Sequence, residues 1–232
     1  MAVVVLLLAL AFGASPFLVP DFGGFDPQAF PIPQNNPPVQ PAGYAFAIWG
    51  PIYLWLIAGA FFGLFKRHDD PDWSPMRIPL AVSFGTGAIW LPVALLSPIL
   101  ATILIWVMLI FALFALFQAP EKDPFFARLP IGLYAGWLSA ASCVAVGLIL
   151  GGYGFLSLNI TAWSMIGIAA IGATFIQIKI AAVPTYGLAV IWALIAVAVQ
   201  NEFGLGGPAL MALTGAGAVA FVMLRGLIQR AV

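Results

Sequence analysis

Long apolar runs, separated by short stretches that contain Pro, Gly and charged residues, divide this chain of 232 residues into eight segments. The runs show no alternation of apolar and polar positions, which a lipid-facing β-barrel would require. Hydrocarbon offers no partner to an open backbone, so each run is predicted to be a membrane-spanning helix. The predicted spans are residues 2–19, 43–65, 79–97, 98–118, 131–150, 158–178, 183–200 and 208–226.

The composition supports the same class. Only 7% of the residues are charged and 63% are hydrophobic, whereas soluble domains carry about 25% charged residues. These values exclude a soluble globular protein and a disordered one. The formal net charge is zero and there is no basic patch, so nucleic-acid binding is also excluded. The predicted fold class is an all-α, polytopic bundle of about eight transmembrane helices.

The charged residues predict an orientation in the membrane. With eight spans, every basic residue falls on one side: Lys66, Arg67 and Arg77; Lys122 and Arg128; Lys179; Arg225 and Arg230. The loops on the other side contain Asp21, Asp26 and Glu202. Because basic loops remain in the cytoplasm, both termini are expected there. No basic residue precedes the first apolar run, so that run is expected to be a helix and not a signal peptide. A bacterial inner membrane is the expected location.

Seven prolines lie in residues 20–42, between the first two spans. Proline fixes φ and removes a backbone donor, so this segment is expected to be extended and semi-rigid. It is either a plain linker or a lid over the outer mouth of the bundle. Its apolar residues, Phe22, Phe25, Phe30 and Ile32, favour packing against the helices.

The sequence has little material for catalysis or ion transport. It contains one cysteine, Cys143, and one histidine, His68, and no span has a clear mid-membrane acid or base. Pumps and ion-coupled transporters usually place ionisable groups in the membrane, and hydrolysis needs acid–base pairs. We therefore expect a protein that is neither an enzyme nor a metal protein.

Aromatic residues are the main chemical resource. Phe46, Trp49 and Tyr53 share one helix face, and so do Tyr134 and Trp137. Such residues either pack in the core or line a cavity for a flat hydrophobic ligand such as a tetrapyrrole, a sterol or a carotenoid.

Glycines recur at a spacing of four in three spans, at Gly59/Gly63, Gly132/Gly136 and Gly147/Gly151. Small residues at this spacing allow two helices to approach closely. The approach could serve packing within the chain or a homodimer, and packing within the chain is favoured.

Three motifs resemble the TspO/MBR family, the tryptophan-rich sensory proteins related to the mitochondrial translocator protein. The first is Pro41-x7-Trp49-x3-Tyr53 after a Pro-rich loop; the second is Tyr134-x-x-Trp137 followed by Ala141; the third is Trp90. The resemblance covers about residues 1–150. Gly87 departs from it, because the family has Asn three residues before this Trp. Further along, Tyr186 to Trp192 resembles the seventh helix of a longer, eight-span branch.

The resemblance implies a five-helix core over residues 1–150, with three additional helices over 151–232. It also implies an outward-facing cavity for a porphyrin-type tetrapyrrole or a sterol-like lipid, and a sensory, regulatory or ligand-trafficking role. The expected cavity residues are Phe46, Trp49, Tyr53, Trp90, Tyr134 and Trp137. Expected partners are membrane lipids, a hydrophobic small molecule, and a second copy or other membrane proteins.

Two other functions stay open at this point. One is a structural accessory subunit in a larger, pigment-bearing complex. The other is light-dependent porphyrin breakdown, which has been proposed for the family and is ranked last, because the chain offers no acid–base pair.

Overall fold

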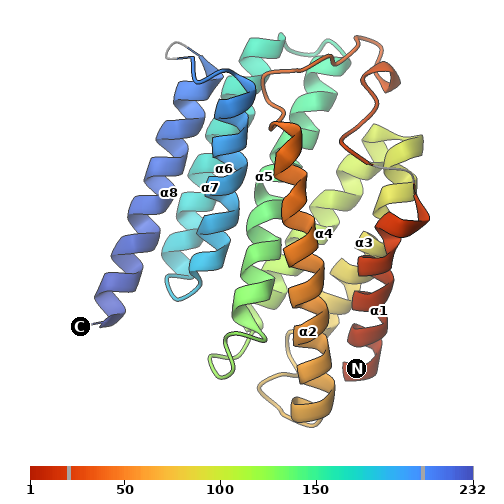
Figure 1. Ribbon diagram of the computed structural model, residues 1–232, viewed down its shortest axis with the longest axis vertical. Helices are drawn as coiled ribbons and strands as arrows, with labels where there is room; N and C mark the ends of the chain where they lie inside the picture. Colours follow the sequence, from red (N-terminus) through yellow and green to blue (C-terminus); the bar gives the residue numbers. More distant parts are fainter. Residues whose placement is uncertain (20–21, 205–206, 232) are drawn as a thin grey trace.

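The computed structural model describes residues 1–19, 22–204 and 207–231, so Pro20 and Asp21 of the Pro-rich loop lie outside the described residues. Within these ranges all regular structure is helical, which confirms the predicted fold class (Figure 1). The α-helices are α1 (Ala2–Ala14), α2 (Trp49–Arg67), α3 (Arg77–Leu96), α4 (Pro98–Gln118), α5 (Arg128–Gly152), α6 (Leu158–Lys179), α7 (Pro184–Gln200) and α8 (Pro208–Ala231). Short 3-10 segments are η1 (Ser15–Leu18), η2 (Pro27–Ala29) and η3 (Gly43–Ile48).

Among the described residues, six helical segments are long and apolar enough to cross a membrane, by length and composition: α3 to α6, α8, and α2 together with η3. The protein is therefore an integral, multi-pass membrane protein. The other two predicted spans form helices that are apolar but shorter, Ala2–Leu18 and Pro184–Gln200. The second of these measures about 26 Å at 1.5 Å per residue, slightly less than the hydrocarbon core of about 30 Å.

The first five helices close into a ring. α1 packs against α2 and α3, α3 packs against α4, and α4 and α2 both pack against α5. α5 also contacts α6 and α7, which pack with α8 into a second group. α5 thus separates the two groups, and it is the most buried of the long helices.

The small residues of α5 explain how α7 approaches it so closely. A Cβ atom added at Gly136 would overlap the carbonyl oxygen of Tyr186, and one at Gly132 would lie 2.7 Å from Thr185 Oγ1. A Cβ atom added at Gly59 would likewise overlap the backbone carbonyl oxygen of Phe126. The predicted intrachain packing is therefore confirmed for these glycines.

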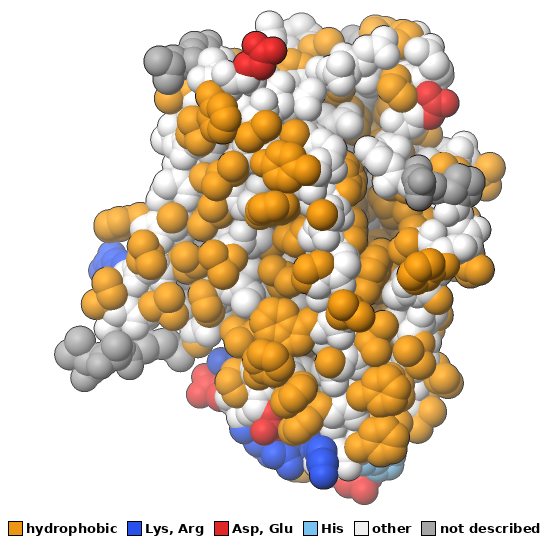
Figure 2. Space-filling view, in the orientation of Figure 1, with side chains coloured by type: hydrophobic (Ala, Val, Ile, Leu, Met, Phe, Trp, Pro, Cys, Tyr) orange, Lys and Arg blue, Asp and Glu red, His pale blue; other side chains and the backbone are white. Residues whose placement is uncertain are grey.

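The loops with most of the charge lie at one end of the bundle. Arg67 forms a two-pronged ion pair with Asp123, with Nε at 2.7 Å from Oδ2, and Lys122 Nζ lies 2.6 Å from Asp70 Oδ2. These pairs join the end of α2 and the α2–α3 loop to the α4–α5 loop. The start of α1 and the end of α8 also lie toward this end (Figure 1). Hydrophobic side chains cover the middle of the visible face (Figure 2).

The Pro-rich loop covers the opposite end and is fixed there by hydrogen bonds. The backbone N–H of Ile32 donates to Gly152 (2.9 Å), and that of Ala42 donates to Ala196 (3.0 Å). Asn201 Nδ2 donates to the carbonyl oxygen of Pro38 at 2.9 Å. Through its described residues, 22–42, this segment is a cover packed on the helices and not a free linker.

Candidate ligand-binding cavity

A cavity of about 380 Å³ lies beneath the start of the Pro-rich loop. Its walls come from the end of α1 with η1, from η3 with the start of α2, from the end of α3, and from the loop itself. The lining residues are Phe12, Gly13, Pro16, Phe17, Phe22, Phe46, Trp49, Gly50, Tyr53, Trp90 and Leu91. Pro16, Phe17 and Gly50 are exposed, so the mouth lies between η1 and α2.

One wall is a stack of two aromatic rings. The rings of Trp49 and Tyr53 are nearly parallel, with centroids 5.2 Å apart and planes at 17°. Phe12 meets both rings edge-on, at 4.9 Å from Tyr53 and 5.8 Å from Trp49. Offset stacks and edge-to-face pairs are the favoured aromatic geometries. The wall is therefore flat and supported from behind.

Trp90, near the end of α3, also lines the cavity. Its indole Nε1 donates to the carbonyl oxygen of Ala101 in α4 at 2.8 Å, which fixes the orientation of the ring. Phe22 of the loop meets Trp90 edge-on at 5.3 Å. Trp90 thus links the cover to the helices.

The structure puts four of the six predicted residues, Phe46, Trp49, Tyr53 and Trp90, on the cavity surface. Tyr134 and Trp137 do not line it, because both are buried in α5 behind the wall. Tyr134 lies 6.4 Å and Trp137 6.2 Å from Trp49, measured between ring centroids. These two residues support the stack.

A buried hydrogen-bond chain holds Tyr134 in place. Its hydroxyl donates to Ser83 Oγ at 2.9 Å, and Ser83 in turn donates to the carbonyl oxygen of Met108 at 2.8 Å. The chain connects α5, α3 and α4. Trp137 Nε1 differs, because this buried donor has no hydrogen-bond partner among the described residues.

Sequence reasoning missed the contribution of α1 to the cavity. Phe12 is 3% exposed and contacts four aromatic rings. A Cβ atom at Gly87 would lie 2.6 Å from the Phe12 ring, so glycine at this position makes room for Phe12. Glycine in place of the family's Asn at position 87 therefore indicates that another side chain packs closely there. The sequence alone could not show that this side chain is Phe12.

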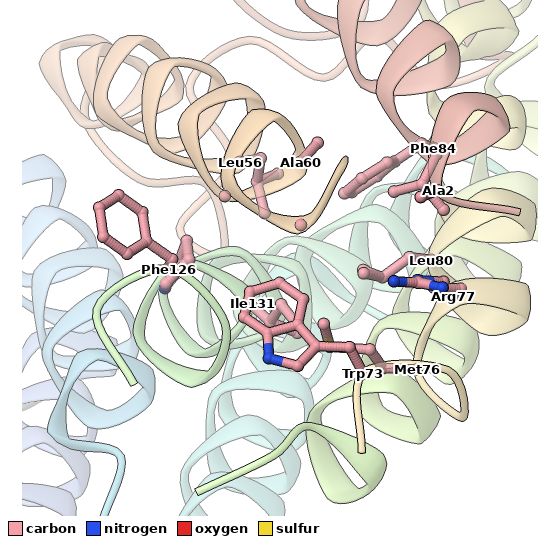
Figure 3. A pocket seen from close by; sticks show the side chains of 14 residues that line it. Ala2, Leu56, Ala60, Trp73, Met76, Arg77, Leu80, Phe84, Phe126 and Ile131 are labelled. Carbon is pink, nitrogen blue, oxygen red and sulfur yellow. The ribbon is translucent and has the colours of Figure 1, made fainter. Parts of the chain in front are cut away.

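A second, much smaller pocket lies near the charged end (Figure 3). Its volume is about 30 Å³, roughly the space of one water molecule. Trp73 closes it, and the Arg77 guanidinium beside it is occupied in bonds to the carbonyl oxygens of His68 and Arg67. This pocket is too small for an organic ligand. Within the described ranges no group of three or more His, Cys, Asp or Glu could hold a metal ion.

A family model described as TSPO-like protein matches residues 32–227, which run from the Pro-rich loop into the last helix. No curated protein and no solved structure matches the chain.

Proposed function

Because the chain belongs to the family of TSPO-like proteins, we propose that it binds a flat hydrophobic ligand in the cavity beneath the Pro-rich loop. A tetrapyrrole such as a porphyrin, a sterol-like lipid and a carotenoid are the ligand classes. The biological role would be sensing, regulation or trafficking of that ligand.

The observation that carries this proposal is the aromatic lining of the cavity, which includes Trp49, Tyr53 and Trp90. A volume of about 380 Å³ falls within the range of about 300–1,000 Å³ typical of small-molecule sites. Trp49 and Tyr53 form a nearly parallel ring stack, and Trp90 adds further aromatic surface to the same cavity. A planar apolar molecule in the cavity would gain dispersion contacts with these rings.

The division of the chain fits the same proposal. We assign ligand binding to residues 1–150, which contain all the described residues that line the cavity. Residues 151–232 add three helices, and these would support α5 from its other side. The proposed orientation has the cavity on the outer side of a bacterial inner membrane, with both termini in the cytoplasm.

Binding accounts for the cavity better than catalysis or a purely structural role. Among the described residues that line it, only Tyr53 carries an ionisable group, so acid–base chemistry has little support. A protein that served only to pack against other membrane subunits would not need a cavity of this size behind a fixed cover.

The test is a titration of the purified full chain with protoporphyrin IX, followed by quenching of tryptophan fluorescence. Trp49→Ala removes one wall, and we expect the affinity to fall at least tenfold, in line with the loss of a central aromatic contact. Trp106→Ala is the matched control, because Trp106 is a half-exposed residue of α4 that does not line the cavity.

Two outcomes would count against the proposal. Equal affinity of wild type, Trp49→Ala and Trp106→Ala would mean that porphyrin does not bind in this cavity. Failure to bind protoporphyrin, a sterol or a carotenoid, together with stable co-purification of unrelated membrane subunits, would favour the accessory-subunit alternative.

A further inference from the structure

A groove lies between α6 and α8, on helices that contribute nothing to the cavity. Its volume is about 630 Å³, and it follows α6 from Trp163 to Ile178 and α8 from Leu210 to Ala218. Small residues lie along it, among them Gly167, Ala170 and Gly215. An added Cβ atom at Gly167 would make ordinary van der Waals contact with Met211, at 3.6 Å from Sδ, so a larger side chain at this position would occupy groove space.

Apart from the indole N–H of Trp163, at the end of the groove away from Lys179, the polar side chains that line the groove use their hydroxyls within their own helices. Thr174 Oγ1 donates to the carbonyl oxygen of Ala170 at 2.7 Å, and Thr214 Oγ1 donates to that of Leu210 at 2.8 Å. Both hydroxyls are thus satisfied by their own helices. A polar occupant would lose its own hydrogen bonds here, so the groove suits an apolar chain.

The length of the groove suits a lipid tail. Fifteen residues separate Trp163 from Ile178, which corresponds to about 22 Å along a helix. One leaflet of a bilayer supplies about 15 Å of hydrocarbon, half of the core thickness. An acyl chain that enters from one leaflet therefore fits within the groove.

Two cations lie at one end of the groove. Lys179 Nζ is 5.5 Å from the ring centroid of Phe175, a groove residue. Arg225 follows Ala218 by seven residues, so it lies on the same face of α8 two turns further on. Gly226 packs against Ala181, which puts this part of α8 beside the end of α6.

No carboxylate from these helices neutralises the two cations, because α6, α7 and α8 contain no Asp or Glu. An apolar groove with two cations at its inner end matches a phospholipid with an anionic headgroup. We propose that the groove binds such a lipid, with one acyl chain between α6 and α8 and the headgroup phosphate beside Lys179 and Arg225.

A second copy of the chain fits the groove less well. In a two-fold dimer within one membrane, the same ends of the helices meet. Lys179 and Arg225 would then approach the same cations of the other copy, which is repulsive. A lipid phosphate, by contrast, would be attracted to the positive charges of Lys179 and Arg225.

The test uses photoreactive lipids and the full chain. The protein is reconstituted in phosphatidylcholine vesicles that contain a trace of phosphatidylglycerol or phosphatidylcholine, each with the same diazirine-bearing acyl chain. After illumination, the crosslinked residues are mapped by mass spectrometry. We expect phosphatidylglycerol to label residues 163–178 and 210–218 preferentially, and phosphatidylcholine to label the apolar surface evenly.

Two variants and two matched controls define the site. Lys179→Gln with Arg225→Gln should lower phosphatidylglycerol labelling by about fivefold for each cation lost, whereas Lys66→Gln, on exposed α2, should leave it unchanged. Gly167→Leu should fill the groove and abolish the preference. Gly172→Leu, on another face of α6 with open space around it, should not.

Other results would overturn the proposal. Equal labelling of the groove by both lipids would mean that the groove holds no anionic lipid. Equal phosphatidylglycerol labelling of Gly167→Leu and Gly172→Leu would mean the same. A dimer that Gly167→Leu converts to a monomer would assign the groove to a second copy. All variants are first checked for a single symmetric peak in size-exclusion chromatography, so that misfolding is recognised.

Discussion

Substitution of Gly136 by alanine tests the close contact between α5 and α7. A Cβ atom at this position would overlap the carbonyl oxygen of Tyr186 and would lie 3.0 Å from Ala189 Cβ. Carbon atoms in contact prefer about 3.5–4.0 Å. The two helices must therefore separate by about 0.5–1 Å to accept one methyl group.

The cost of this separation can be estimated from two neighbouring hydrogen bonds. Thr185 Oγ1 donates to the carbonyl oxygen of Leu129 at 2.7 Å, and the hydroxyls of Ser139 and Tyr186 are 3.0 Å apart. Separation of α5 and α7 would lengthen both hydrogen bonds until they are weak or broken. Side-chain hydrogen bonds between helices in membrane proteins contribute about 0.6 kcal/mol each. Overpacking itself costs about 1–3 kcal/mol. The expected loss is about 2–4 kcal/mol.

The assay is thermal unfolding of purified protein in detergent, followed by tryptophan fluorescence. A loss of this size corresponds to a fall in Tm of about 5–15 °C for a chain of this length. Gly172→Ala is the matched control, since a Cβ atom there meets nothing within 4 Å. In that control the alanine should be neutral or stabilising by up to about 1 kcal/mol. If Gly136→Ala and Gly172→Ala unfold at the same temperature, the argument for close α5–α7 packing is refuted.

Three further predictions concern the two ends of the bundle. The hydrogen bond from Lys122 lowers the pKa of the Asp70 carboxyl, so this pair stabilises the fold above the ordinary carboxyl pKa of about 3.9 and is lost as the pH falls below it. The Tm difference between wild type and Asp70→Asn should therefore be present at neutral pH and vanish in strong acid; a difference that does not change with pH would contradict this cause. In a Cys143→Ala background, a cysteine in place of Glu202 should react with a membrane-impermeant maleimide on intact cells and one in place of Lys122 should not, and the reverse pattern would invert the proposed orientation. Phe22→Ala removes an edge-on contact with Trp90 and should speed porphyrin release in stopped-flow measurements more than it slows binding, whereas unchanged rates would show that the loop does not retain the ligand.

Some residues of the candidate site could be predicted from the sequence, and others could not. Phe46, Trp49, Tyr53 and Trp90 were predicted from helical spacing and from the family motifs, and all four line the cavity. Spacing relates only residues of one helix, so it could not say that Tyr134 lies behind this wall. Nor could it find Phe12, because its position depends on how α1 packs between α2 and α3.

The sequence by itself determined the helical, membrane-embedded character of the protein and the segregation of its charge. Both follow from local chemistry, because a backbone in hydrocarbon must satisfy its own hydrogen bonds and a charge in hydrocarbon is costly. The tertiary structure decided which aromatic rings face one another, that Phe12 occupies the space left by Gly87, and that α6 and α8 leave a groove between them. These features depend on packing between helices, and every side of an apolar helix is equally acceptable to lipid. The hydrophobic pattern could therefore predict the helices but not the faces on which they meet.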